Sequence, residues 1–287
     1  MSEIKSLLRS AKEKLAAADI AEIDAEHLFA YVIGISRMDL HNSVKLDATL
    51  KSLGDFGVIE DTFAKLISRR AGHEPLQYLT GTAYFRHLEI EVGPGVLIPR
   101  PETESLVDEV LHQLNTFADP VSLVDLGSGT GAIAISIASE TAGKKVVHVV
   151  AVEKSKEAIV WLQKNIAKHD VSVRVIEDDV ATALEGIKCD VVVANPPYLP
   201  DGAQIPQELN FEPTQALFGG PANGMAAPLI FIEAASRLLK PGGLLAIEHN
   251  ELQGPLIASE LAHDFESIAL HRDLTDRPRF TTARRRF

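Results

Sequence analysis

The chain has 287 residues, of which 46% are hydrophobic and 24% charged, values that are ordinary for globular proteins and exclude a disordered, collagen-like or fibrous chain. Its 40 acidic and 28 basic residues give a formal net charge of -12, which disfavours non-specific binding to nucleic acid. A single cysteine, scattered histidines and the lack of a long apolar run argue against a disulfide, a metal site and a membrane span. We therefore expect a soluble cytoplasmic protein without a metal.

Apolar residues in the first part of the chain recur every three or four positions, as in Ile4 and Leu8, which is the spacing of amphipathic helices. Residues that favour turns interrupt the pattern near Asn42 and Gly54. We predict an N-terminal helical domain over residues 1–82, built of four or five short helices.

The next segment has the character of strands. Residues 84–92 alternate between apolar and polar, and the Gly-Pro-Gly turn at 93–95 leads into a second short apolar run at 96–98. We therefore assign residues 83–100 to a β-hairpin linker. Because proline is favourable at the start of a helix, a helix is predicted from 101 to about 115.

From residue 121 onward, short runs that are apolar over most of their length alternate with helical stretches. This rhythm is typical of strands buried on both faces of a parallel sheet, so it predicts a doubly wound α/β domain over residues 101–287. The predicted strands are 121–126, 146–153, 171–177, 190–195 and 244–249. The predicted helices lie near 131–140, 155–168, 226–240 and 251–263. The stretch 199–227 is predicted to be a long functional loop.

A glycine-rich turn follows the first predicted strand and opens a helix. Its glycines allow the backbone to turn tightly and to bring a ligand against the free amide groups of the helix N-terminus. The spacing differs from the dinucleotide-binding pattern, and the lysine of a P-loop is absent. A tight turn without a ligand is the alternative interpretation. The candidate ligand-binding residues are Asp125, Gly127, Ser128, Gly129, Thr130 and Gly131.

Acidic residues end the next two predicted strands. Glu153 is placed to accept both ribose hydroxyls of a nucleoside that lies across the strand ends. Asp178 and Asp179 are candidates for the adenine amino group, although one of the pair is expected to be a turn residue, and Val180 offers apolar contact. Because a phosphate cradle is lacking, this set suits a nucleoside whose other end is an amino acid.

The most specific motif is Asn195-Pro196-Pro197-Tyr198, at the end of the fourth predicted strand. The two prolines end the strand, so the carbonyl groups beside them point into the cleft as acceptors. A planar amino group could donate to the Asn195 side-chain oxygen and the Pro196 carbonyl, while the Tyr198 ring packs on it. These acceptors can orient a nitrogen lone pair and stabilise the positive charge that develops during an in-line displacement.

Residues 120–287 thus resemble class I S-adenosylmethionine-dependent methyltransferases, which implies a Rossmann-like domain with a mostly parallel seven-stranded sheet. The implied cofactor is S-adenosyl-L-methionine, with S-adenosyl-L-homocysteine as the product. The segments Gly81–Phe85 and Val96–Glu104 resemble the protein-(glutamine-N5) methyltransferases of peptide chain release factors, the PrmC or HemK family. That resemblance covers nearly the whole chain.

The resemblance implies methylation of the glutamine N5 in the Gly-Gly-Gln motif of class 1 release factors, a modification for translation termination, with the helical domain binding the factor. It assigns cofactor binding to the glycine-turn residues together with Glu153, Asp179, Val180 and Asn195. It assigns catalysis to Asn195, Pro196 and Tyr198, and substrate binding to Asn195, Pro196, Pro197, Tyr198 and Arg100.

Two alternatives share parts of this pattern. A nucleic-acid adenine-N6 methyltransferase has the same Asn-Pro-Pro-Tyr motif, but about -10 of the net charge lies after residue 80, on the segment with the motifs. A non-catalytic binding module is disfavoured by the intact glycine turn. We expect a release factor as partner, no direct DNA binding, no membrane contact and a monomer. The arginine-rich stretch 277–286 is interpreted as a solvated last strand and tail.

Overall fold

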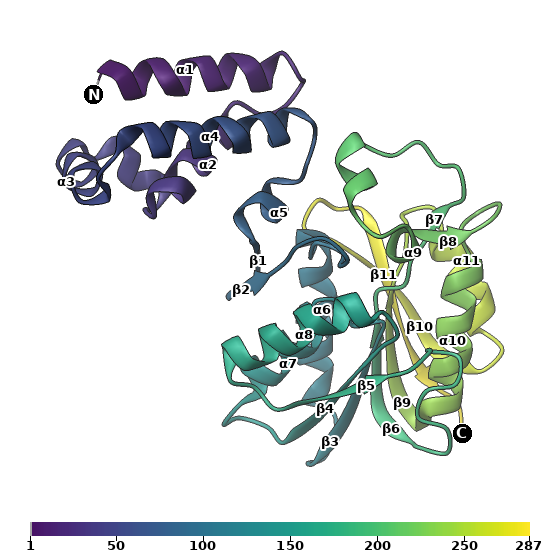
Figure 1. The fold of residues 1–287 in the computed structure, drawn as a ribbon. Helices are drawn as coiled ribbons and strands as arrows, with labels where there is room; N and C mark the ends of the chain where they lie inside the picture. Colours follow the sequence, from purple (N-terminus) through teal and green to yellow (C-terminus); the bar gives the residue numbers. More distant parts are fainter. Residues whose placement is uncertain (1) are drawn as a thin grey trace. The chain divides into compact units, whose positions relative to one another are not determined.

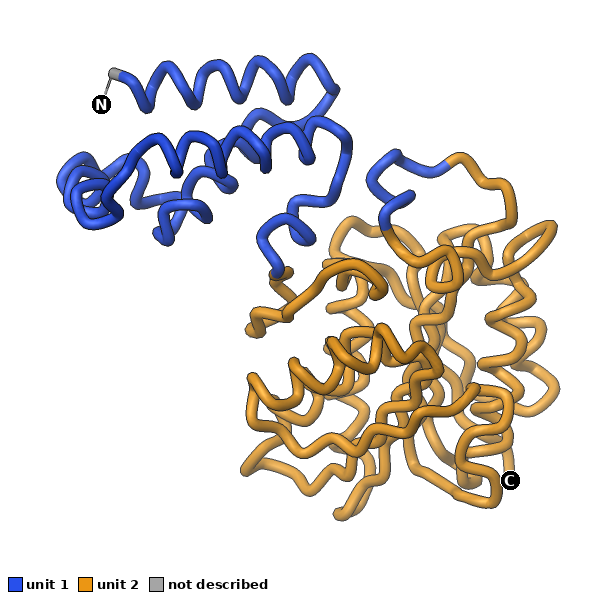
Figure 2. The backbone as a smooth tube through the Cα atoms, viewed as in Figure 1, with its two compact units in different colours: residues 1–81, 205–211 blue, residues 82–204, 212–287 orange. Residues whose placement is uncertain are grey.

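The computed structural model describes residues 2–287, which form two compact units. The helical unit comprises Met1–Gly81 and the distant segment Ile205–Phe211, whereas the sheet unit comprises Thr82–Gln204 and Glu212–Phe287 (Figure 2). Within the described residues, no helix is both long and apolar enough to cross a membrane. The segment 205–211 was not expected in the helical unit, because nothing in its composition distinguishes it from the loop around it.

The helical unit contains helices where apolar residues recur every three or four positions, as the sequence predicts. Two of its helices are longer than expected, with 15 residues in α1 and 16 in α4. Leu15 and Leu28 are fully buried in the core, where the rings of Phe29 and Phe63 meet edge to face at 5.2 Å. The elements are α1 (Ser2–Ala16), α2 (Ile23–Ile33), η1 (Arg37–His41), α3 (Ser43–Leu53), α4 (Phe56–Ala71) and α5 (Leu76–Thr80) (Figure 1).

A buried arginine joins the segment 205–211 to this unit. Arg70, whose side chain is 6% exposed, donates from Nε to the Asp24 carboxylate at 2.8 Å and also pairs with Glu208. Its Nη1 donates to the Glu74 carbonyl at 3.0 Å. Two carboxylates and a carbonyl therefore satisfy one buried guanidinium, and Glu208 brings the 3₁₀ helix η3 (Gln207–Phe211) to α4.

Substituting Arg70 by methionine should destabilise the helical unit by about 3 kcal/mol, because the Asp24 carboxylate would be left buried without its partner. Thermal unfolding of the full chain measures this effect. The matched control is Arg69→Met, since Arg69 pairs with Glu74 through a side chain that is 53% exposed and should cost about 1 kcal/mol or less. Equal losses in the two variants would contradict a structural role for the buried cluster.

The predicted β-hairpin exists, but its turn was placed wrongly. Strands β1 (Thr82–Phe85) and β2 (Leu88–Glu91) pair antiparallel, and the turn between them is formed by Arg86 and His87. Arg86 has φ of 53°, a left-handed conformation that its residue type does not announce. Its amide donates to Glu104 and its guanidinium pairs with Asp108 and Glu140, so contacts distant in sequence stabilise the turn. Residues 96–98, expected as the second strand, are not in a strand.

The sheet unit contains the predicted mostly parallel sheet of seven strands, in the order β10-β11-β9-β6-β3-β4-β5. Strand β11 runs antiparallel to both of its neighbours, β10 and β9, and all other neighbouring pairs of this sheet are parallel. The strands are β3 (Val121–Leu126), β4 (Val147–Glu153), β5 (Val173–Glu177), β6 (Cys189–Ala194), β9 (Leu239–Glu248), β10 (Phe265–Arg272) and β11 (Pro278–Arg285). The arginine-rich stretch was interpreted as a solvated last strand and tail. It does form the last strand, but that strand lies inside the sheet with a buried centre, and its Arg279 and Arg285 pair with Asp273 and Asp264.

Helices cover both faces of this sheet, with α7 and α8 on one side and α10 and α11 on the other (Figure 1). The α10 and α11 face encloses a large apolar core with side chains of β3, β6 and β9. The helices are α6 (Glu104–Leu114), preceded by η2 (Pro101–Thr103), α7 (Ala132–Thr141), α8 (Lys156–His169), α10 (Ala226–Leu238) and α11 (Gly254–Leu261). The expected long loop contains short elements: β7 (Leu199–Pro200), η3, α9 (Thr214–Leu217) and β8 (Phe218–Gly220).

Candidate functional site

A cavity of about 410 Å³ opens at the carboxyl ends of β3, β4, β5 and β6, where doubly wound sheets bind ligands. The strand ends bring together segments that lie far apart in the sequence. From the predicted site, the lining includes Arg100, Gly127, Ser128, Gly129, Thr130, Glu153, Asp179, Val180, Asn195 and Pro197. Apolar side chains complete the wall, among them Phe85, Val96, Leu97, Ile133 and Phe231.

The glycine turn needs its glycines for backbone conformation and for packing. Gly127, Gly129 and Gly131 all have positive φ, and a Cβ at Gly131 would lie 2.4 Å from Leu162 Cδ1. Gly131 itself does not line the cavity but precedes α7. The turn is tied to the next strand by Glu153, whose carboxylate accepts from the Gly129 amide at 2.9 Å. Two distant predicted residues are therefore hydrogen bonded to each other.

Asp125 lies below this turn and not on the cavity wall. It is 0% exposed, and neither carboxylate oxygen has a hydrogen-bond partner within residues 2–287. Burial, helped by the nearby charge of Glu153, raises the pKa of Asp125 to about 7. The structure therefore buries this candidate cofactor residue near the end of β3, outside the cavity lining.

In the wild type, the buried Asp125 should destabilise the folded state increasingly as pH rises, and the Asp125→Asn variant should lack this effect. In the unfolded chain Asp125 ionises near its usual pKa of 3.8, whereas in the folded state it holds its proton up to about pH 7. The folded state is therefore penalised progressively as pH rises between these values. We expect the stability of the variant relative to the wild type to be about 3 kcal/mol greater at pH 8 than at pH 5. Urea unfolding at both pH values checks this, and parallel pH profiles would contradict it.

The structure distinguishes between the two aspartates that follow β5. Asp178 does not line the cavity, because its carboxylate accepts from the Asp179 amide at 2.7 Å and from the Thr182 hydroxyl at 3.2 Å. Asp179 and Val180 do line it, and Asp179 pairs with Lys154 at 3.3 Å across the cavity edge. Asp178 is thus the expected turn residue, and Lys154 is a lining residue that the sequence did not single out.

The Asn-Pro-Pro-Tyr turn contributes Asn195 and Pro197 to the cavity wall, whereas Pro196 and Tyr198 lie outside the lining. Two glycines pack against the backbone of this turn. A Cβ at Gly219 would lie 2.6 Å from the Pro197 carbonyl oxygen, and one at Gly224 would lie 2.3 Å from that of Tyr198. Close backbone contact with the β7–β8 region therefore fixes the course of the motif.

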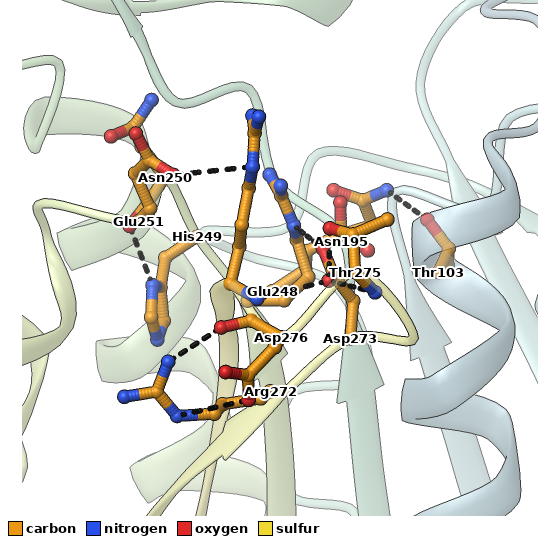
Figure 3. Close-up of polar contacts among 12 residues, drawn as sticks. Thr103, Asn195, Glu248, His249, Asn250, Glu251, Arg272, Asp273, Thr275 and Asp276 are labelled. Carbon is orange, nitrogen blue, oxygen red and sulfur yellow. Dashed lines mark hydrogen bonds and ion pairs between the residues drawn. The ribbon is translucent and has the colours of Figure 1, made fainter.

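Three further polar residues support the predicted site. Thr103 lines the cavity and accepts a hydrogen bond from the Asn195 side-chain nitrogen at 3.2 Å (Figure 3). Glu212, buried, pairs with Arg100 and accepts from the Ile98 amide at 2.9 Å. Glu248 ends β9 and is 1% exposed. A polar residue at the end of a predicted strand was the available sequence signal for Glu248, whereas Glu212 carried none.

Next to the Asn-Pro-Pro-Tyr turn, Glu248 and Tyr198 form a buried pair of ionisable groups whose pKa values are both raised. Burial raises the pKa of Glu248 to about 7, against the hydrogen bond from Thr103 and the positive charge of Arg279. The Tyr198 hydroxyl lies 3.4 Å from Glu248 Oε1. Burial, with the Glu248 charge, raises the pKa of Tyr198 as well, so its phenol stays protonated at neutral pH.

Solved structures share this fold. A T. thermophilus 16S rRNA N2 G1207 methyltransferase, determined with AdoMet and guanosine, matches with a TM-score of 0.53 at 22% identity, over 71% of this chain and 50% of that one. A methyltransferase from Pyrococcus furiosus matches with a TM-score of 0.50 at 16% identity, over 70% of this chain and 90% of that one. The fold is that of the class I methyltransferases.

Sequence relatives narrow the class to one family. The chain matches the Methyltransferase small domain over residues 105–217 and the PrmC N-terminal domain over residues 6–81. It belongs to the release factor glutamine methyltransferase family. Relatives with that name from Mycolicibacterium smegmatis and Streptomyces coelicolor are 39% and 36% identical, each over 99% of both chains, and one from Bifidobacterium longum is 38% identical over 98% of this chain and 99% of its own.

Proposed function

We propose that the chain transfers a methyl group from S-adenosyl-L-methionine to the side-chain nitrogen N5 of the glutamine in the Gly-Gly-Gln motif of class 1 release factors. The observation that carries this proposal is the position of Asn195, which shares one cavity with the glycine turn and Glu153. A side-chain oxygen that can accept hydrogen bonds from a planar amide thus lies beside residues that suit a nucleoside. Membership of the glutamine methyltransferase family supports an amide rather than a base as the methyl acceptor.

The cavity has the properties that this cofactor requires. Its volume of about 410 Å³ falls within the range of small-ligand sites, and its walls are largely apolar. Glu153 uses its carboxylate to accept from Gly129 and Ser155, at 2.9 and 2.8 Å, and each carboxylate oxygen has a further lone pair for a ribose hydroxyl. Val180 and Asp179 would border the adenine, and Gly127 and Gly129 the methionine portion.

The residues of the chain act by orienting the substrate. Bound S-adenosyl-L-methionine supplies a methyl group on a positively charged sulfur, which leaves as the neutral thioether. The Asn195 side-chain oxygen and the Pro196 carbonyl would accept the two hydrogens of the glutamine amide and direct its nitrogen lone pair at the methyl. These dipoles also stabilise the positive charge that forms on nitrogen, which then loses a proton to water. Arg100, fixed by Glu212, would border the substrate entry.

We further propose that the helical unit binds the release factor in the cytoplasm. Its family match to the PrmC N-terminal domain over residues 6–81 supports a role specific to this family rather than to methyltransferases in general. The acidity of the remaining chain, about -10 after residue 80, favours a protein substrate over DNA.

A methyl-transfer assay tests the function directly. The wild-type chain is incubated with the labelled cofactor and, in parallel, with a class 1 release factor, the same factor carrying Gln→Ala in its Gly-Gly-Gln loop, and duplex DNA. We expect label on the intact factor alone, at the glutamine. Label on DNA, or equal label on both factors, would contradict the proposed acceptor.

A further inference from the structure

We propose that Thr103 and Glu248 are positioning residues that fix the orientation of the Asn195 amide. This inference rests on the proposed function, because it concerns the group that would hold the glutamine. It extends the site to two residues outside the Asn-Pro-Pro-Tyr motif, one on η2 and one at the end of β9.

The direction of the hydrogen bond between Asn195 and Thr103 determines which end of the Asn195 amide can face the substrate. The Asn195 nitrogen donates to the Thr103 hydroxyl at 3.2 Å, and this contact places the nitrogen on one side of the amide and leaves the oxygen free on the other (Figure 3). Only the amide oxygen can accept from a substrate NH₂, since the nitrogen can only donate. If the Asn195 amide were rotated by 180°, its NH₂ group would face the NH₂ group of the glutamine. Because both groups only donate, the proposed hydrogen bond could not form.

The Thr103 hydroxyl can accept from Asn195 only while its own proton is directed elsewhere. We assign this proton to the buried carboxyl group of Glu248, whose pKa the Thr103 hydroxyl lowers as a hydrogen-bond donor. The Tyr198 hydroxyl lies 3.4 Å from Oε1 of the same carboxyl group. Thr103 is 3% exposed and Glu248 is 1% exposed, and in such buried surroundings hydrogen bonds are stronger than in water. In the proposed arrangement the donors run from Asn195 to Thr103 and on to Glu248, so that Glu248 orients the Thr103 hydroxyl and Thr103 orients the Asn195 amide.

Burying the Glu248 carboxyl group costs folding free energy, so its presence at this position suggests a role beyond packing. One of its oxygens, Oε2, has no hydrogen-bond partner within the described part of the chain. The charged groups that face it are Arg279 from β11 and Glu102 from η2, together with the Tyr198 phenol. Arg279 is already paired with Asp273 at 2.9 Å, so Glu248 has no dedicated cation. An apolar residue would fill this place more stably if packing were all that the site required.

Substitutions of Thr103 test the inference. Thr103→Val keeps the shape but removes the hydroxyl, so we expect kcat for methyl transfer to fall about thirtyfold, with the cofactor Kd and the thermal midpoint changed little. Thr103→Ser restores the hydroxyl and should recover most of kcat. The matched control is Ser105→Ala, because the Ser105 hydroxyl is buried two residues away and has no partner in the described chain. It should leave kcat unchanged.

Substitutions of Glu248 test the second step. Glu248→Gln keeps an acceptor for Thr103 and should retain most of kcat, whereas Glu248→Leu should lower kcat to the level of Thr103→Val. Because a protonated Glu248 carboxyl keeps an acceptor oxygen, as glutamine does, the wild-type kcat profile should show no large step near pH 7, the pKa to which burial raises this group. A double variant of Thr103→Val and Glu248→Leu should be no slower than either single variant, since both break the same chain of contacts.

A spectroscopic measurement separates this inference from the proposed function. In ¹⁵N spectra of the cofactor-free protein, the side-chain NH₂ signals of Asn195 should shift in Thr103→Val and return in Thr103→Ser. If the wild type methylates no release factor but these signals respond, the function is wrong and the positioning role stands. Unchanged Asn195 signals, or wild-type kcat in Thr103→Val, would overturn the positioning role whatever the substrate is.

Discussion

Asn195→Ala is expected to lower kcat for release-factor methylation by about a thousandfold, the largest effect of any single substitution in the site. The variant removes the oxygen that accepts from the glutamine amide, so the nitrogen lone pair is no longer directed and its developing charge is less stabilised. The glycine turn and Glu153 stay intact, and their hydrogen bond at 2.9 Å does not involve Asn195. Cofactor binding should therefore weaken by less than about tenfold.

Single-turnover kinetics with labelled cofactor, together with calorimetry, separates these two effects. Asn115→Ala is the matched control, because Asn115 follows α6 and does not line the cavity. It should leave both kcat and the cofactor Kd unchanged. A fall in cofactor affinity as large as the fall in kcat would mean that Asn195 binds the cofactor and does not orient the acceptor.

Gly219→Ala should distort the Asn-Pro-Pro-Tyr turn and lower kcat about a hundredfold, since a displacement of about 1 Å in a catalytic group can have such an effect. A Cβ at this position would lie 2.2 Å from the Gly224 carbonyl oxygen and 2.6 Å from that of Pro197. Both atoms belong to the backbone, so they cannot move without shifting the Asn-Pro-Pro-Tyr turn or the segment between β8 and α10. The same crowding should destabilise the sheet unit by about 3 kcal/mol.

Gly202→Ala, in the same loop, separates crowding from backbone strain. Gly202 has φ of 76°, but a Cβ there meets nothing within 4 Å. Its alanine variant should lose only about 1 kcal/mol and keep its kcat, because the strain is local and the motif is not displaced. Thermal unfolding and kcat of the two variants provide the comparison. Equal kcat in Gly219→Ala and the wild type would show that the turn does not depend on this contact.

The framework of the site follows from local sequence patterns. Runs such as 121–126 and 190–195 are apolar at most positions and do not alternate with polar residues, which is typical of strands buried on both faces. Once these strands are parallel, their carboxyl ends meet, so Gly129, Glu153 and Asn195 must come together. The cavity was predictable for that reason, although its individual contacts were not.

The remaining features depend on contacts between distant residues. The left-handed turn at Arg86 is stabilised by Glu104 and Glu140, which no local pattern connects with it. Asp125 was expected at the ligand together with the glycine turn, but it lies in β3, an interior strand whose side chains are buried on both faces. Tyr198 was expected beside the substrate, whereas its hydroxyl lies next to Glu248, outside the cavity lining.

The helical unit is built from two segments that are far apart in the sequence, and this limits where the chain can be cut into separate domains. The backbone passes from one unit to the other after Gly81, again after Gln204, and back after Phe211. A gene fragment that encodes residues 82–287 would therefore carry 205–211 without the Arg70 that pairs with Glu208. The helical unit is accordingly not a detachable module, and an exchange of this unit between related enzymes would have to replace both of its chain segments together.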